Sequence, residues 1–149
     1  SCLKQMIDQY SGIGGMIAVE EIQGKEISNY GVLDIESDDK EKIKIKGLVE
    51  KPSFDQAPSN YAVVGRYILT PKIFEYLDKH EKGTGDEIQL TDALSWTAKH
   101  EEYYGLKIKG ERFDCGSKIG FLRANISFAM RRNDLHSDML EYIKSFTSK

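Results

Sequence analysis

An acidic and a basic side chain, Glu50 and Lys51, stand next to each other where a predicted strand ends. The strand is indicated by residues 43–46, in which apolar and charged side chains alternate with a period of two. Pro52 follows and cannot donate to a strand ladder, and ligands of open α/β sheets bind at the carboxyl ends of strands. A carboxylate accepts hydrogen bonds from neighbouring hydroxyls, whereas a lysine ammonium suits a phosphate. The pair is therefore suited to holding a phosphorylated sugar.

Taken alone, Glu50, Lys51 and three further candidate residues, Gly31, Val63 and Asp114, each have a simpler explanation. Glu50 and Lys51 also fit two solvated residues at the start of a surface loop. Gly31 fits a strand position where another backbone comes close. Asp114 fits a carboxylate that bonds the backbone of its own turn, and Val63 fits the hydrophobic core.

Six blocks of sequence change that balance. They are YGVLD at 30–34, VEKP at 49–52, PSN at 58–60, AVVGRY at 62–67, GDEIQLTDA at 85–93 and FDCG at 113–116. In this order they resemble the second half of the bacterial UTP:glucose-1-phosphate uridylyltransferases, over nearly the whole chain. The EKP tripeptide is shared by the wider superfamily of sugar-1-phosphate nucleotidylyltransferases, whereas EIQLTD and the run 59–67 point to the uridylyltransferase branch.

The resemblance implies an activity and a role for each residue. The activity is transfer of a uridylyl group from UTP to glucose 1-phosphate, which gives UDP-glucose and diphosphate. Lys51 is the implied catalytic residue and holds the sugar phosphate, while Glu50 binds the glucose hydroxyls. Gly31 lets the sugar ring approach the backbone, and Val63 lines the sugar pocket. Asp114 is the implied ligand of Mg²⁺, the expected cofactor, which commonly takes one or two protein carboxylates beside substrate phosphates.

The resemblance also implies that part of the fold is missing. The Gly-rich nucleotide loop and the second acidic metal ligand of this family have no counterpart here, the first residue is not methionine, and residues 2–10 have helical spacing from the start. We therefore expect residues 1–149 to be the carboxyl-terminal, sugar-phosphate side of a single nucleotidyltransferase domain, without turnover by itself. We expect a homo-oligomer, in which the last two helices serve as the interface.

The composition of the chain argues against several other classes of protein. The chain has 149 residues and a formal net charge of −3, with lysines and acidic residues interleaved, which argues against nucleic acid as a partner. It has neither a membrane-spanning apolar run nor a secretory leader, so we expect a cytoplasmic protein that binds no membrane. Cys2 and Cys115 are too few and too far apart in sequence for a disulfide framework, and Cys/His zinc spacing is absent.

The hydrophobic pattern alternates between strands and helices. Strands are predicted at 16–19, 30–35, 42–49, 62–69 and 103–109, the second and third of them as a hairpin. Helices are predicted at 2–10, 71–80 and 91–100, from 117 and from 134, with Thr70, Thr91 and Ser117 as caps. The pattern gives an α/β class. The resemblance makes it the carboxyl-terminal portion of a Rossmann-like nucleotide-diphospho-sugar transferase fold, a mixed sheet with flanking helices.

Two other functions stay open at the level of sequence. Another sugar-1-phosphate nucleotidylyltransferase, such as a thymidylyltransferase, is compatible because base selection lies mainly in the other half of these enzymes. A non-catalytic module that binds a sugar phosphate or mediates oligomerisation is also compatible. Substrate assays on the product of the complete gene separate these functions.

Overall fold

The computed structural model describes residues 1–39, 42–79 and 86–147. The chain forms two compact units, Ser1–Lys109 (unit 1) and Gly110–Lys149 (unit 2). The sequence pattern predicted one domain that ends in two helices, and those two helices make up most of unit 2. Their use in oligomerisation stays a prediction.

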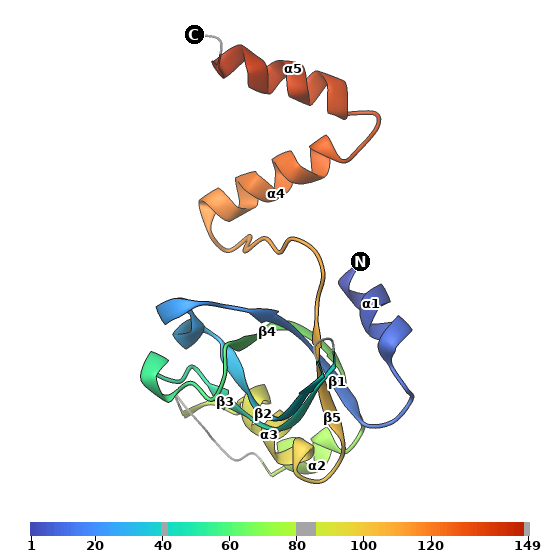
Figure 1. Ribbon diagram of the computed structural model, residues 1–149, viewed down its shortest axis with the longest axis vertical. Helices are drawn as coiled ribbons and strands as arrows, with labels where there is room; N and C mark the ends of the chain where they lie inside the picture. The colour runs from blue at the N-terminus through green and yellow to red at the C-terminus, as the bar shows by residue number, and fades with distance from the viewer. Residues whose placement is uncertain (40–41, 80–85, 148–149) are drawn as a thin grey trace. The chain divides into compact units, whose positions relative to one another are not determined.

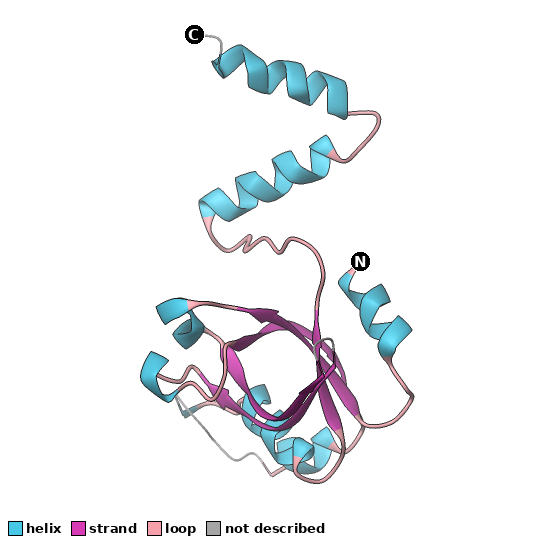
Figure 2. Cartoon of the chain, in the orientation of Figure 1, coloured by secondary structure: helices cyan, strands magenta, loops and turns pink. Residues whose placement is uncertain are grey.

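Unit 1 is built on a mixed sheet whose described strands close into a barrel, in the order β1, β4, β2, β3, β5 (Figures 1 and 2). β1 pairs with β5 in parallel, and the other neighbouring strands are antiparallel. The mixed sheet was predicted, whereas its closure was not. The strands are β1 (Gly15–Glu21), β2 (Gly31–Asp39), β3 (Lys42–Glu50), β4 (Tyr61–Ile68) and β5 (Tyr103–Lys107).

The predicted hairpin is formed by β2 and β3. Its register pairs Gly31 with Glu50 at one end and Asp39 with Lys42 at the other. Ile43 and Ile45 are buried, whereas Lys46 is exposed, as the alternating pattern requires. The polar residues 37–40 predict the turn of this hairpin, but the ladder runs further, because Ser37, Asp38 and Asp39 belong to β2 and pair with β3. Residue 40 lies outside the described residues.

β1 is buried on both faces, which explains its continuous apolar run. Ile17 and Val19 pack into the main core, and Met16 and Ala18 pack into a second cluster with Met6 of α1 (Cys2–Gln9). The stripe predicted on this helix is only partly buried, because Leu3 and Ile7 are 53% and 60% exposed. Met6 is the buried residue of α1, with Cys2 and Tyr10 packed beside it in the second cluster.

Two helices cover the β3 side of the main core, α2 (Ile73–Leu77) and α3 (Leu90–Ala98). The helix predicted over 71–80 is observed over Ile73–Leu77. The hydroxyl of Thr70, the predicted cap, instead donates to Glu101 (2.5 Å). The spacing of Ile73, Phe74 and Leu77 predicts that they form its buried face; Ile73 is buried and Leu77 partly buried, but Phe74 is 61% exposed. The glycines predict a loop over 82–86, of which residues 82–85, like His80, lie outside the described residues. Two short 3-10 helices, η1 (Gly24–Asn29) and η2 (Phe54–Gln56), complete unit 1.

Unit 2 contains α4 (Lys118–Met130) and α5 (His136–Thr147). The predicted cap is confirmed, because Ser117 Oγ accepts the N–H of Gly120 at 3.1 Å. Ala124 is buried, whereas Ile119 is 59% exposed. Within the described part of the chain, no helix is long and apolar enough to cross a membrane.

Candidate functional site

The β2–β3 hairpin brings Gly31 and Glu50 face to face at the end of the ladder. The side chain of Glu50 is 15% exposed, so its carboxylate lies largely away from water. The hydroxyl of Thr91, at the start of α3, donates to Oε2 of Glu50 at 2.6 Å. The other oxygen, Oε1, lies 3.8 Å from Nζ of Lys51. An acid and a base therefore meet at this end of the β2–β3 ladder, as the sequence predicted.

Lys51 leaves the strand in a left-handed conformation, with a φ of 43°. Its N–H donates to the carbonyl oxygen of Tyr30 at 3.0 Å, which holds this turn against the start of β2. A non-glycine residue in this region is strained, and such strain gathers at functional sites. The ladder thus ends at a bent backbone as well as before Pro52, while the Lys51 side chain is 62% exposed.

Gly31 leaves a space that a side chain would fill. A Cβ at this position would lie 3.2 Å from Oε2 of Glu50 and 3.3 Å from Oγ1 of Thr91. Both distances are shorter than ordinary van der Waals contacts, so a larger residue would push against the two polar atoms. The glycine therefore leaves room beside the Glu50 carboxylate and the Thr91 hydroxyl that a side chain would take.

β4 carries two residues relevant to the candidate site, Tyr67 and Val63. Burial raises the pKa of the Tyr67 hydroxyl, and the negative charge of Glu50 raises it further. Val63 lies opposite Val19 in the β1–β4 ladder and packs against the main core. Its predicted place in a sugar pocket stays a prediction.

Asp114 lies in unit 2, whereas Gly31, Glu50, Lys51 and Val63 lie in unit 1. Its Oδ1 accepts the N–H of Gly116 at 3.0 Å, as a turn carboxylate does. Within residues 1–39, 42–79 and 86–147, no three or more His, Cys, Asp or Glu side chains are grouped to hold a metal ion. The role of Asp114 as a magnesium ligand stays a prediction.

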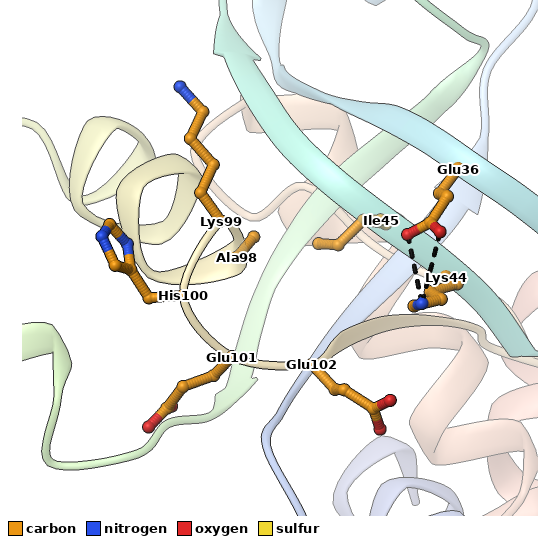
Figure 3. A pocket seen from close by; sticks show the side chains of 8 residues that line it. All are labelled: Glu36, Lys44, Ile45, Ala98, Lys99, His100, Glu101 and Glu102. Atoms are coloured by element: carbon orange, nitrogen blue, oxygen red, sulfur yellow. Dashed lines mark hydrogen bonds and ion pairs between the residues drawn. The ribbon is translucent and has the colours of Figure 1, made fainter.

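A hollow of about 330 Å³ lies at the opposite end of α3 from the candidate site (Figure 3). Ala98 at that end is seven residues from Thr91, roughly 10 Å along a helix. The carboxylates that line this hollow interact with neighbouring side chains. Glu36 pairs with Lys44 at 3.3 Å, and Glu102 accepts a hydrogen bond from the hydroxyl of Tyr104 at 3.1 Å. We place the functional site at Glu50, where the Thr91 hydroxyl and the Lys51 ammonium converge on one largely buried carboxylate.

Thr91 is the residue that the sequence pattern missed. The block 85–93 was recognisable, but Thr91 was interpreted as the cap of α3. In the structure Gln89 is the N-cap residue, and its side chain caps no N–H, while the Thr91 hydroxyl turns to Glu50. The partner lies 41 residues earlier in the chain, so local spacing carried no signal for the contact. Gly85 of the same block lies outside the described residues.

The sequence is similar to one family of known proteins. The sequence matches the profile of the nucleotidyl transferase family over residues 2–130. A UTP–glucose-1-phosphate uridylyltransferase of Komagataeibacter xylinus is 46% identical over 120 residues, 80% of this chain and 42% of that protein. Another, of Staphylococcus saprophyticus, is 40% identical over 144 residues, 96% of this chain and 50% of that protein. The chain spans about half the length of the curated relatives it matches.

Solved structures confirm the fold. A UDP-glucose pyrophosphorylase complexed with UDP-glucose superposes with a TM-score of 0.80 at 43% identity, over 89% of this chain and 51% of that chain. The UTP-bound enzyme of Acinetobacter baumannii superposes with a TM-score of 0.78 at 32% identity, over 95% of this chain and 48% of that chain. The mixed α/β sheet with flanking helices is thus a portion of the fold seen in these proteins.

Proposed function

Because the chain belongs to the nucleotidyl transferase family, we propose that the whole protein transfers a uridylyl group from UTP to glucose 1-phosphate. The products are UDP-glucose and diphosphate. The proposal is supported by relatives of that name at 40–46% identity. The observation that carries it is the Glu50 carboxylate, held by Thr91 beside Lys51 and above the space left by Gly31.

The arrangement suits the chemistry of this transfer. A phosphate oxygen of glucose 1-phosphate attacks the α-phosphorus of UTP, a new P–O bond forms, and the bond to the leaving diphosphate breaks. Two anions must approach each other, so catalysis depends on positioning and on neutralising charge. Lys51 neutralises the sugar phosphate. Glu50 accepts hydrogen bonds from the glucose hydroxyls, Gly31 lets the ring come close, and Val63 borders the ring.

Mg²⁺ is part of the proposal, with Asp114 as one of its ligands. The fit rests on donor chemistry, because a carboxylate is a hard oxygen ligand and Mg²⁺ commonly takes one or two of them beside substrate phosphates. The ion supplies charge stabilisation at the phosphates. We expect removal of divalent cations with EDTA to abolish UDP-glucose formation and added Mg²⁺ to restore it. Full activity in EDTA would overturn this part of the proposal.

The activity itself is tested on the product of the complete gene. UDP-glucose and diphosphate are measured after incubation with UTP, glucose 1-phosphate and Mg²⁺, and TTP is assayed in parallel. Formation of UDP-glucose with UTP preferred supports the proposal. Preference for TTP would reassign the protein to thymidylyl transfer, and the absence of turnover with every nucleotide would leave a binding module.

We further propose that the protein works in the cytoplasm as a homo-oligomer. Support for the compartment comes from Cys2 and Cys115, which are free thiols in the structure. Support for assembly comes from unit 2, where large apolar side chains such as Ile119, Phe128 and Phe146 are 59–65% exposed. Fractionation of cells and the solution mass of the purified protein test the two statements separately.

A further inference from the structure

α3 is fastened to β3 at two points that lie four residues apart on the helix. Ser95 Oγ accepts the N–H of Leu48 at 3.3 Å. Thr91 Oγ1 donates to Oε2 of Glu50 at 2.6 Å. Residues four apart share one face of a helix, so this face of α3 follows β3 to its end at the candidate site (Figure 1).

The two contacts differ in the group that each hydroxyl reaches. Ser95 reaches a backbone N–H and so fixes the helix to the strand. Thr91 reaches the carboxylate that, under the proposed function, binds the sugar. Hydrogen bonds to a charged group are short and strong, and a 2.6 Å separation is at the short end of the range. Because Glu50 is only 15% exposed, loss of this donor leaves a carboxylate oxygen that water replaces poorly.

The hydrogen bond also gives the two oxygens of Glu50 different surroundings. Oε2 is bound by Thr91 and faces the space left by Gly31, whereas Oε1 lies on the Lys51 side. A Cβ on Gly31 would lie 3.7 Å from the Thr91 methyl group, so that methyl forms a wall of the same space. Thr91 therefore touches the candidate site with both its hydroxyl and its methyl group.

We propose that Thr91 is a positioning residue, which holds Glu50 Oε2 so that the carboxylate meets the hydroxyls of the sugar phosphate in one orientation. The inference rests on the proposed function and deepens it. A carboxylate held by one oxygen loses rotational freedom before the ligand arrives, which lowers the cost of binding. The benefit falls on the sugar phosphate and not on the nucleotide.

The test uses the product of the complete gene and two substitutions at one position. Thr91→Val keeps the shape and the methyl wall but removes the donor. We expect it to raise the KM for glucose 1-phosphate about tenfold, as for loss of a hydrogen bond to a charged group, and to leave the KM for UTP within about twofold. Thr91→Ser keeps the donor, and we expect its KM for glucose 1-phosphate to stay within about threefold of the wild type.

Ser95→Ala is the matched control, because it removes the other hydroxyl contact between α3 and β3. We expect a lower Tm with both KM values unchanged. A merely structural role for Thr91 would give Thr91→Val the same signature as Ser95→Ala.

Three results would overturn the inference: an unchanged KM for glucose 1-phosphate in Thr91→Val, an equal rise in both KM values, or a Thr91→Ser enzyme as impaired as Thr91→Val. If Thr91→Val does not fold, Thr91→Ala replaces it, and failure of both to fold would make the hydroxyl a structural requirement and end the positioning role. A wild-type protein that makes no UDP-glucose would overturn the proposed function itself. An active wild type with a normal Thr91→Val enzyme would overturn the inference alone.

Discussion

Glu50 and Lys51 are better explained by a ligand than by the stability of the fold. Their charged groups lie 3.8 Å apart, and the Lys51 side chain is 62% exposed. An ion pair at this separation, with the ammonium in water, contributes about 0–1 kcal/mol. The left-handed backbone of Lys51, by contrast, costs on the order of 1–3 kcal/mol. A strained residue whose side chain adds little to folding is consistent with a role in binding.

The first residue-scale prediction concerns Lys51. We expect Lys51→Ala to lower kcat/KM for glucose 1-phosphate about a hundredfold, close to 2.7 kcal/mol of transition-state stabilisation, because a cation beside two approaching anions is lost. Lys46→Ala is the control, since Lys46 lies on β3, the strand that ends just before Lys51, and pairs with Asp34 at 3.4 Å on the exposed surface. Steady-state kinetics with both variants decide the point. An unchanged rate in Lys51→Ala would remove Lys51 from the catalytic machinery.

The second concerns Tyr67 and alkaline pH. Burial and then the charge of Glu50 raise the pKa of this hydroxyl above the usual value of about 10. The folded state therefore holds the proton more tightly than the unfolded state, so the contribution is complete below about pH 10 and is lost as the pH rises through the folded pKa. We expect Tyr67→Phe to lose less Tm than the wild type between about pH 9 and 11.

Part of the alkaline slope should remain in that variant. Hydrogen bonds to Asp38 and to Glu102 raise the pKa values of Tyr61 and Tyr104 as well. Parallel Tm curves for the wild type and Tyr67→Phe would contradict the assignment of a raised pKa to Tyr67.

At the scale of elements, the seam between β1 and β5 closes the barrel. Gly15 pairs with Tyr103 across this parallel seam, and a Cβ on Gly15 would lie 2.1 Å from the Tyr103 ring. We expect Gly15→Ala to destabilise the protein by about 1–3 kcal/mol, because the buried ring must leave its place. Thermal unfolding of the wild type and the variant measures the effect. An unchanged Tm would mean that the seam yields without cost.

The strands were predictable because each follows a local pattern. The alternation at 43–46 and the apolar run at 16–19 reflect burial on one face and on two faces, and both are confirmed. Barrel closure was not predictable, because the pairing of Gly15 with Tyr103 depends on residues far apart in the chain. The helical spacing also gave a wrong prediction at Phe74. This residue lies on a helix of five residues and is exposed to water, whereas its neighbour Ile73 is buried.

The candidate site divides in the same way. Glu50 and Lys51 were predictable because strand and proline signals meet there. Their closeness to Gly31 followed from the hairpin, and its register confirms it. Thr91 was missed because a capping role and a tertiary contact look alike in sequence, and only the packing of α3 on β3 distinguishes them.

At the scale of the whole molecule, the family match leaves the last helix of the chain outside it. It ends at residue 130, so it includes α4 but not α5 of unit 2. On α5 the rings of Tyr142 and Phe146 lie 5.0 Å apart in an edge-to-face contact, and the two residues are 62% and 65% exposed. Exposed aromatic pairs of this kind are typical of interaction surfaces.

The homo-oligomer proposal predicts that this aromatic pair is buried between copies. Burying a large apolar side chain stabilises by about 2 kcal/mol, so replacing both rings with lysine should weaken self-association at least about a hundredfold. Ser137→Lys with Ser145→Lys adds the same charge at exposed polar positions of the same helix and serves as the control. Light scattering at matched concentrations should give a multiple of the chain mass for the wild type and the control, and a lower mass for the Tyr142→Lys, Phe146→Lys variant. Both variants add equal charge, so charge repulsion alone would lower both masses equally, and that result would contradict a place for α5 in the interface. A monomeric wild type would contradict the homo-oligomer proposal itself.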